Sequence, residues 1–159
     1  MSATLTKPRP KKISGVVDTC VHHPSGKFTG KPTATGFAPS KMIKCIQDGL
    51  PIEELDALQT SLDVPMETLA TKLGISKATL HRRKLEGRLD PVESDRVVRF
   101  ARLMGQTVKV FGSEAEGRDW LNTPQFGLGG AVPLDYAETE IGAREVENLL
   151  GRIEYGVYS

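Results

Sequence analysis

The chain has 159 residues, of which 38% are hydrophobic and 6% aromatic, enough to bury one modest core or two small ones. It has no apolar run of the roughly 18 to 20 residues that cross a bilayer, and its N-terminus lacks the apolar stretch of a secretory signal. Its two cysteines do not make a disulfide framework. We therefore expect a cytoplasmic protein with reduced thiols and no membrane association.

The net charge of +1 conceals a gradient along the chain. Residues 1–49 carry eight basic and two acidic side chains, whereas residues 113–159 carry three basic and nine acidic ones. Such blocks are often only solvated faces. The gradient nevertheless favours a polyanionic partner on the N-terminal side and a basic or neutral protein surface on the C-terminal side.

Residues 1–40 are rich in proline, glycine and lysine and show little periodicity, which predicts an irregular basic arm. Val16 and Val17 could form a short extended piece within it. The arm could add phosphate contacts beside a DNA-binding motif, or it could be an ordinary terminus.

Four side chains of the types that bind zinc occur in the first third of the chain. They are Cys20, His22, His23 and Cys45. The usual pair of cysteines separated by two residues is absent, so we expect no metal site and no cofactor.

Residues 41–112 are predicted to form a bundle of about five helices, the DNA-binding domain of an all-α protein. Ser40 caps the first helix, which ends before Gly49. Pro91 starts a long helix, and residues 106–111 are interpreted as its tail followed by a loop. The stripe expected to face the core comprises Val92, Val97, Phe100, Leu103 and Met104.

Residues 66–89 carry the most informative pattern, two short apolar-periodic pieces separated by Gly74. Ser76 is a good N-cap for the second piece, Leu80 should face inward, and Gly87 should end the helix. Two short helices that meet at a glycine-containing turn are typical of a helix-turn-helix. The second helix has a basic outer face, which suits the major groove of DNA. A helical hairpin with a merely solvated basic face is the alternative.

The residues expected to contact DNA fall into two groups. The group expected at base edges or the groove floor comprises Ser76, Lys77, His81 and Arg82. The group expected at phosphates comprises Thr79, Arg83, Lys84 and Arg88.

Residues 113–159 are predicted to form a small helical domain. Ser113 caps a short acidic helix, and Thr139 caps a final helix that runs to about Tyr155. Its inward-facing residues are predicted to be Ile141, Val146, Leu149, Leu150 and Ile153. The glycine-rich stretch at residues 127–130 follows no strand and precedes no lysine, so it does not indicate a phosphate-binding loop.

A linear pattern in this segment resembles the toxin-binding domain of Xre/MbcA/ParS-type antitoxins. The pattern comprises Trp120-Leu121-Asn122-Thr123-Pro124, Leu128-Gly129-Gly130, Pro133, Gly142, Val146, Leu150, Ile153 and Tyr155-Gly156. With the helix-turn-helix the resemblance covers roughly residues 50–159. Gln125 departs from it, because the family more often has Asn after the proline, and Arg83 stands where such motifs often have an aliphatic residue.

The resemblance implies an antitoxin of a type II toxin–antitoxin system whose partner is a RES-domain toxin that degrades NAD. It implies that the C-terminal domain covers the toxin's active-site entrance and that the antitoxin represses its own operon by binding operator DNA, as a homodimer or larger assembly. The residues expected to contact the toxin are Arg144, Glu147, Arg152, Glu154, Tyr155 and Tyr158. We place the dimer interface at residues 97–104.

Two other classes of function are weighed against this interpretation. A free-standing helix-turn-helix regulator with a C-terminal effector-binding or oligomerisation domain would share the DNA-binding half. An enzyme is not expected, because the sequence shows no nucleophile–base pair, metal set or phosphate cradle.

Overall fold

The computed structural model describes residues 15–22 and 39–156, and within these ranges every regular element is a helix. The elements are α1 (Val16–His22), α2 (Pro39–Asp48), α3 (Glu53–Leu62), α4 (Met66–Lys72), α5 (Lys77–Glu86), α6 (Pro91–Phe111), α7 (Glu114–Leu121), the 3-10 turn η1 (Phe126–Leu128), α8 (Pro133–Tyr136) and α9 (Glu140–Glu154). The predicted all-α fold is confirmed.

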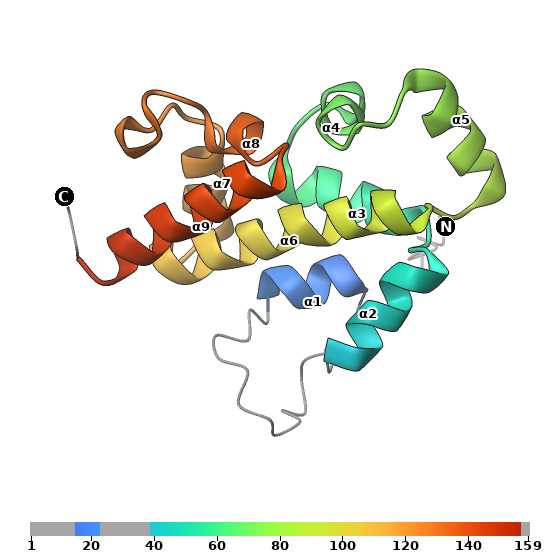
Figure 1. Ribbon diagram of the computed structural model, residues 1–159, viewed down its shortest axis with the longest axis horizontal. Coiled ribbons are helices and arrows are strands. Elements are labelled where there is room, and N and C mark those ends of the chain that lie inside the picture. Colours follow the sequence, from blue (N-terminus) through green and yellow to red (C-terminus); the bar gives the residue numbers. More distant parts are fainter. Residues whose placement is uncertain (1–14, 23–38, 157–159) are drawn as a thin grey trace, which may run out of the picture.

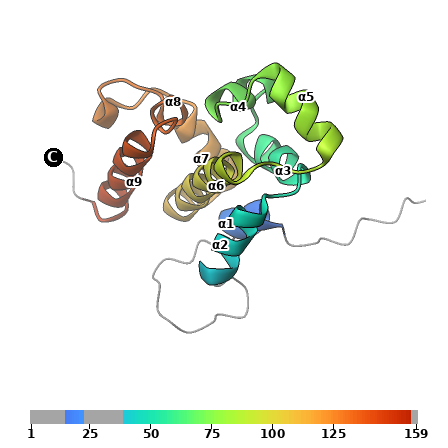
Figure 2. The same cartoon turned by 45° about the vertical axis from the view of Figure 1, so that its right-hand side comes forward.

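Helix α6 is the axis around which the other elements pack. It contacts α1, α2, α3, α7 and α9 (Figures 1 and 2). Its first turn is closed by a capping box, in which Asp90 and Glu93 bind each other's backbone N–H groups. The helix continues to Phe111, so the predicted helical tail is confirmed but no loop follows before Gly112.

The buried face of α6 corrects two expectations. Val92 is 59% exposed and does not belong to the inward stripe. Val97, Phe100, Leu103 and Met104 are fully buried within this one chain. The proposed dimer interface at residues 97–104 is therefore wrong, because these side chains already fill the core of the subunit.

Helix α1 occupies part of the predicted arm and packs on α6 and α3. The backbone N–H groups of Val16 and Val17 both donate to the Glu54 carboxylate, each at 2.9 Å. The buried apolar residues of α1 are Val16, Val17, Cys20 and Val21. The extended piece expected at Val16 and Val17 is therefore wrong, and the other arm residues, 1–14 and 23–38, lie outside the described residues.

Helices α7 and α9 pack on α6, and α8 packs on α7 and α9. In Figure 1 this group lies on the side of the molecule away from α5. Ser113 and Thr139 cap α7 and α9 as predicted. In α9, Val146 and Leu150 are buried but Ile141 is 77% exposed, so its inward assignment is wrong. Ile141 lies five residues before Val146, about 140° around the helix, which places it off the buried stripe.

Polar contacts join the C-terminal elements to α3 and α4. The Lys72 ammonium of α4 pairs with the Asp135 carboxylate of α8 and lies 3.7 Å from the Glu138 carboxylate. Arg118 of α7 donates from Nε to the Ser61 carbonyl at the end of α3, at 3.0 Å. These contacts, together with the shared α6 core, make the two halves one packed unit.

Candidate nucleic-acid interface and C-terminal surface

Helices α4 and α5 meet at a turn that has the glycine and the helix cap predicted from the sequence. Gly74 has a φ of +70°, in the left-handed region that favours glycine. The Ser76 hydroxyl accepts from the Thr79 N–H at 3.2 Å and caps α5. Leu80 is the buried anchor of α5, and Gly87 ends the helix with a φ of +77°. The bounds predicted for the second helix of the motif are confirmed.

The outward face of α5 carries most of the residues predicted to contact DNA. The exposed members of that set are Ser76, Lys77, His81, Arg82, Lys84 and Arg88. Thr79 is half-buried, and its hydroxyl accepts from that of Ser76 at 2.9 Å. The free face is therefore basic and polar and is not covered by any described element.

Arg83 lies on the opposite side of α5, inside a cluster of carboxylates. Its guanidinium contacts Glu93 at 2.8 Å, Glu86 at 3.0 Å and Asp90 at 3.1 Å, and its side chain is only 15% exposed. Hydrogen bonds to Glu93 and then Glu86 raise the pKa of Arg83 further above its ordinary value. The expectation that Arg83 reaches a phosphate is wrong, because this side chain ties α5 to the start of α6.

Arg88 is exposed, but its guanidinium is also engaged within the chain. It donates to the carbonyl of Gly49 at 2.7 Å and to that of Asp48 at 3.2 Å. These carbonyls end α2, where a cation is favourable to the helix dipole. A phosphate contact by Arg88 would therefore compete with these two hydrogen bonds to the end of α2.

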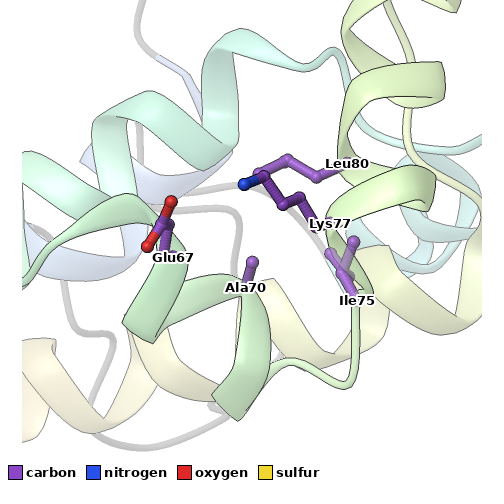
Figure 3. Close-up of a pocket in the computed structure, with 5 residues that line it drawn as sticks. All are labelled: Glu67, Ala70, Ile75, Lys77 and Leu80. Atoms are coloured by element: carbon purple, nitrogen blue, oxygen red, sulfur yellow. The ribbon is translucent and has the colours of Figure 1, made fainter.

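A hollow of about 180 Å³ lies in the crease between α4 and α5. Its lining residues are Glu67, Ala70, Ile75, Lys77 and Leu80. In Figure 3 the Lys77 side chain extends across the hollow toward α4, which carries Glu67 and Ala70. The hollow is smaller than the ~300 Å³ at which ligand pockets usually begin. We therefore interpret it as space left where the two helices of the motif meet, and not as a ligand pocket.

The residues predicted to contact a partner lie mainly along α9. Arg144 is exposed and pairs with Glu140 at 3.0 Å, and Glu154 lies 3.3 Å from the Lys109 ammonium of α6. Glu147 is half-buried and Tyr155 is 77% exposed. Tyr158 lies outside the described residues.

Arg152 is half-buried, and its Nε is fully covered without a hydrogen-bond partner in the described part of the chain. Two large apolar residues of this half are exposed without having been predicted so: Phe126, at 100%, was not considered, and Ile141, at 77%, was placed inward. The spacing of five residues between Ile141 and Val146 could have predicted that Ile141 is exposed. Nothing in the sequence around Phe126 predicts its exposure.

Two protein families match the chain in adjacent segments. Residues 42–102 match the antitoxin Xre-like helix-turn-helix domain, and residues 106–156 match the antitoxin Xre/MbcA/ParS C-terminal toxin-binding domain. The chain is 35% identical over 132 residues to an antitoxin Xre of Yersinia enterocolitica, covering 82% of this chain and 87% of the relative. It is 32% identical over 146 residues to an antitoxin Xre of Photorhabdus laumondii, covering 87% and 99%.

The chain belongs to the Xre family of antitoxins. A more distant relative, a Prs ADP-ribosylating antitoxin of a Sphingobium species, is 26% identical over 132 residues, covering 77% of this chain and 83% of the relative. The antitoxin thus joins a helix-turn-helix domain to a toxin-binding domain, and the boundary between the two family matches falls inside α6.

The described residues of the antitoxin contain no group of three or more His, Cys, Asp or Glu side chains that could hold a metal ion. None of their helices is both long and apolar enough to cross a membrane. Cys20 is buried and Cys45 is half-buried, both as free thiols, while His23 lies outside the described residues.

Proposed function

We propose that this antitoxin binds a RES-domain toxin through its C-terminal half and blocks the entrance to the toxin's active site, which prevents NAD degradation. The observation that carries the proposal is the match of residues 106–156 to a toxin-binding domain. The RES class itself comes from the resemblance of the linear pattern between Trp120 and Gly156.

The surface of α9 is suited to such a partner. Tyr155 is 77% exposed at its end, and tyrosine is a frequent interface anchor because it buries a large area and keeps a polar group. We assign Arg144, Glu147, Arg152, Glu154 and Tyr155 to the contact with the toxin, as well as Tyr158 beyond the described residues. The acidic balance of residues 113–159 favours a basic or neutral entrance on the toxin.

A second class of toxin is an enzyme that transfers ADP-ribose to a protein, which the name of the Sphingobium relative suggests. Such an enzyme also consumes NAD, so the two candidates differ in the fate of the ADP-ribose group. A degrading toxin releases it, whereas a transferring toxin attaches it to a target protein.

The test is to express the antitoxin with the toxin encoded beside it and to follow complex formation, cellular NAD and protein-linked ADP-ribose. We expect a stable complex on size-exclusion chromatography and preserved NAD. Loss of NAD without protein labelling, when the toxin is expressed alone, supports a degrading toxin, and labelling supports the transferring class. Absence of a complex would overturn both forms of the proposal.

The role of the C-terminal end is tested with a truncation after Gly151 and with Tyr155→Ala. Both variants should lose toxin binding while retaining DNA binding. Ile43→Ala, on α2, is the matched control, because Ile43 is also exposed, at 55%, but lies in the other half. Toxin binding that survives the truncation would show that the end of α9 is not the contact.

We further propose that the antitoxin represses its own operon as a homodimer, with α5 in the major groove of each half-site. Ser76, Lys77, His81 and Arg82 then face base edges, and Thr79 and Lys84 face phosphates. Arg82→Ala should weaken binding by about tenfold and relax specificity at one position of the selected sequence. An equal loss on all DNA sequences would show that Arg82 contacts only the backbone.

A further inference from the structure

Helix α5 exposes an apolar residue on its basic outer face, near its C-terminal end. Leu85 is 77% exposed although leucine is normally buried. It follows Ala78, His81 and Arg82 at positions i, i+3, i+4 and i+7, so these four residues lie on one stripe of the helix. All four are exposed.

The direction of this stripe is fixed by the opposite side of α5. Leu80 is buried there, and Arg83 is held by Glu93 at 2.8 Å and Asp90 at 3.1 Å. These contacts prevent α5 from turning about its axis to bury Leu85. In Figure 1, α5 lies at the edge of the molecule and no described element lies beyond it.

The surroundings of Leu85 are basic, which determines the kind of partner. Lys77, His81, Arg82 and Lys84 share the exposed surface of α5. The acidic Glu86 lies 3.0 Å from Arg83 and 3.9 Å from Arg82, so both of its contacts are to arginines. A polyanion is the partner that such a surface attracts. The apolar group that DNA presents in its major groove is the 5-methyl group of thymine.

We propose that Leu85 reads a thymine methyl group in the operator and that Ala78 contacts a second one. Seven residues of helix span about 10 Å, which corresponds to about three base-pair steps of 3.4 Å. The stripe i, i+3, i+4, i+7 is also the spacing with which the recognition helix of homeodomains reads bases in the major groove. The inference rests on the proposed binding of operator DNA by α5.

The experiment uses duplexes selected by the full-length antitoxin from random-sequence DNA. Each thymine of the selected site is replaced, one at a time, by deoxyuridine, which removes only the methyl group. For the natural chain, one position in each half-site should lose about fourfold in affinity, the effect expected for losing one buried methyl group. A second such position should lie about three base pairs away.

Leu85→Ala identifies the side chain that makes the contact. This variant should bind the thymine duplex about as weakly as the natural chain binds the deoxyuridine duplex. It should not lose affinity further when deoxyuridine is introduced at that position. Leu85→Met, which keeps an apolar side chain, should restore most of the discrimination, and Ile43→Ala should discriminate like the natural chain.

Four outcomes would overturn the inference, and they are distinguishable. Failure to select any DNA sequence would remove the proposed DNA binding as well. Selection of a sequence in which every thymine tolerates deoxyuridine, or sensitivity that persists in Leu85→Ala, would remove the role of Leu85 alone. Dissociation of a Leu85→Ala dimer into monomers in sedimentation experiments would assign the residue to contact between copies of the chain.

Discussion

Helices α5 and α9 both present an outward face, but the chain holds them in different ways. Helix α5 has one buried residue, Leu80, and is tied down by Arg83 among three carboxylates. Helix α9 is held by close apolar packing of Ala143, Val146 and Leu150, and by the absence of a side chain at Gly142.

The difference shows two ways to keep a binding face free. A polar tether fixes the rotation of a short helix while leaving almost its whole circumference accessible. Apolar packing gives more stabilisation per residue but covers a broad stripe of the helix. Helix α1 combines the two means, because Glu54 caps its first turn and its apolar side is buried against α6.

The largest effect is expected where α9 approaches α8. A Cβ added at Gly142 would lie 1.7 Å from the backbone oxygen of Tyr136, which cannot move away as a flexible side chain could. Gly142→Ala should lower the free energy of unfolding by about 3 kcal/mol, because the backbone must shift. Thermal or urea unfolding measures this change.

Gly151→Ala is the matched control in the same helix. A Cβ at Gly151 would meet nothing within 4 Å. This substitution should leave the stability unchanged or raise it by up to about 1 kcal/mol, because alanine favours helix. Similar destabilisation by both variants would show that close approach at Gly142 is not what positions α9.

The second prediction concerns α1 at alkaline pH. Burial raises the pKa of the Cys20 thiol from 9.0 to about 11; to a smaller extent, Arg102 lowers this pKa and Glu54 raises it. Between these values the unfolded chain loses the thiol proton while the folded chain keeps it, so stability falls as the pH rises. The loss should reach about 2 kcal/mol.

Urea unfolding across this pH range compares the natural chain with Cys20→Ala. The natural chain should lose stability more steeply, because other groups that titrate there are common to both. Parallel pH profiles would show that Cys20 is not buried as a neutral thiol when α1 is docked.

The third prediction separates tethering from phosphate contact on α5. Arg83→Met should weaken operator binding by about tenfold but leave the salt dependence of binding unchanged, because Arg83 faces Glu93 and Asp90 rather than solvent. Lys84→Met should instead reduce the slope of log affinity against log salt by about one. A reduced slope for Arg83→Met would place its guanidinium on DNA.

The smallest effect is expected at the link between the two halves. The Lys72 side chain is 11% exposed where it pairs with Asp135, whereas the Arg144 side chain is 72% exposed where it pairs with Glu140. Lys72→Met should cost about 1 kcal/mol, and Arg144→Met less than about 0.5 kcal/mol. Equal losses in unfolding experiments would mean that the link contributes no more than a surface pair.

The ends of most helices could be predicted from the sequence because the signals that set them are local. Ser76, Asp90, Ser113 and Thr139 each satisfy backbone N–H groups within the next three residues. Glycines at left-handed positions end α5 and α6 in the same local way. The helix-turn-helix and most of its exposed basic residues followed from these signals.

The sequence predicted less well which face of a helix a residue occupies where the side chains that contact it belong to another helix. Arg83 was expected on the solvent face, but Glu93 and Asp90 in the next helix draw it inward. As a result Leu85, which was not considered, is left on the outward stripe. Val92 and Ile141 were placed inward as members of apolar stripes, although the buried neighbours of each lie on another side of its helix.

By itself the sequence determined the all-helical fold, the DNA-binding motif and the family, because caps, turn glycines and linear motifs act over a few residues. Only the tertiary structure decided that Val16 to His22 form a helix, since seven residues are too few to be stable without packing. Its cap, Glu54, lies 38 residues from Val16. A contact over that distance depends on how α3 and α6 are already packed, and no local pattern records it.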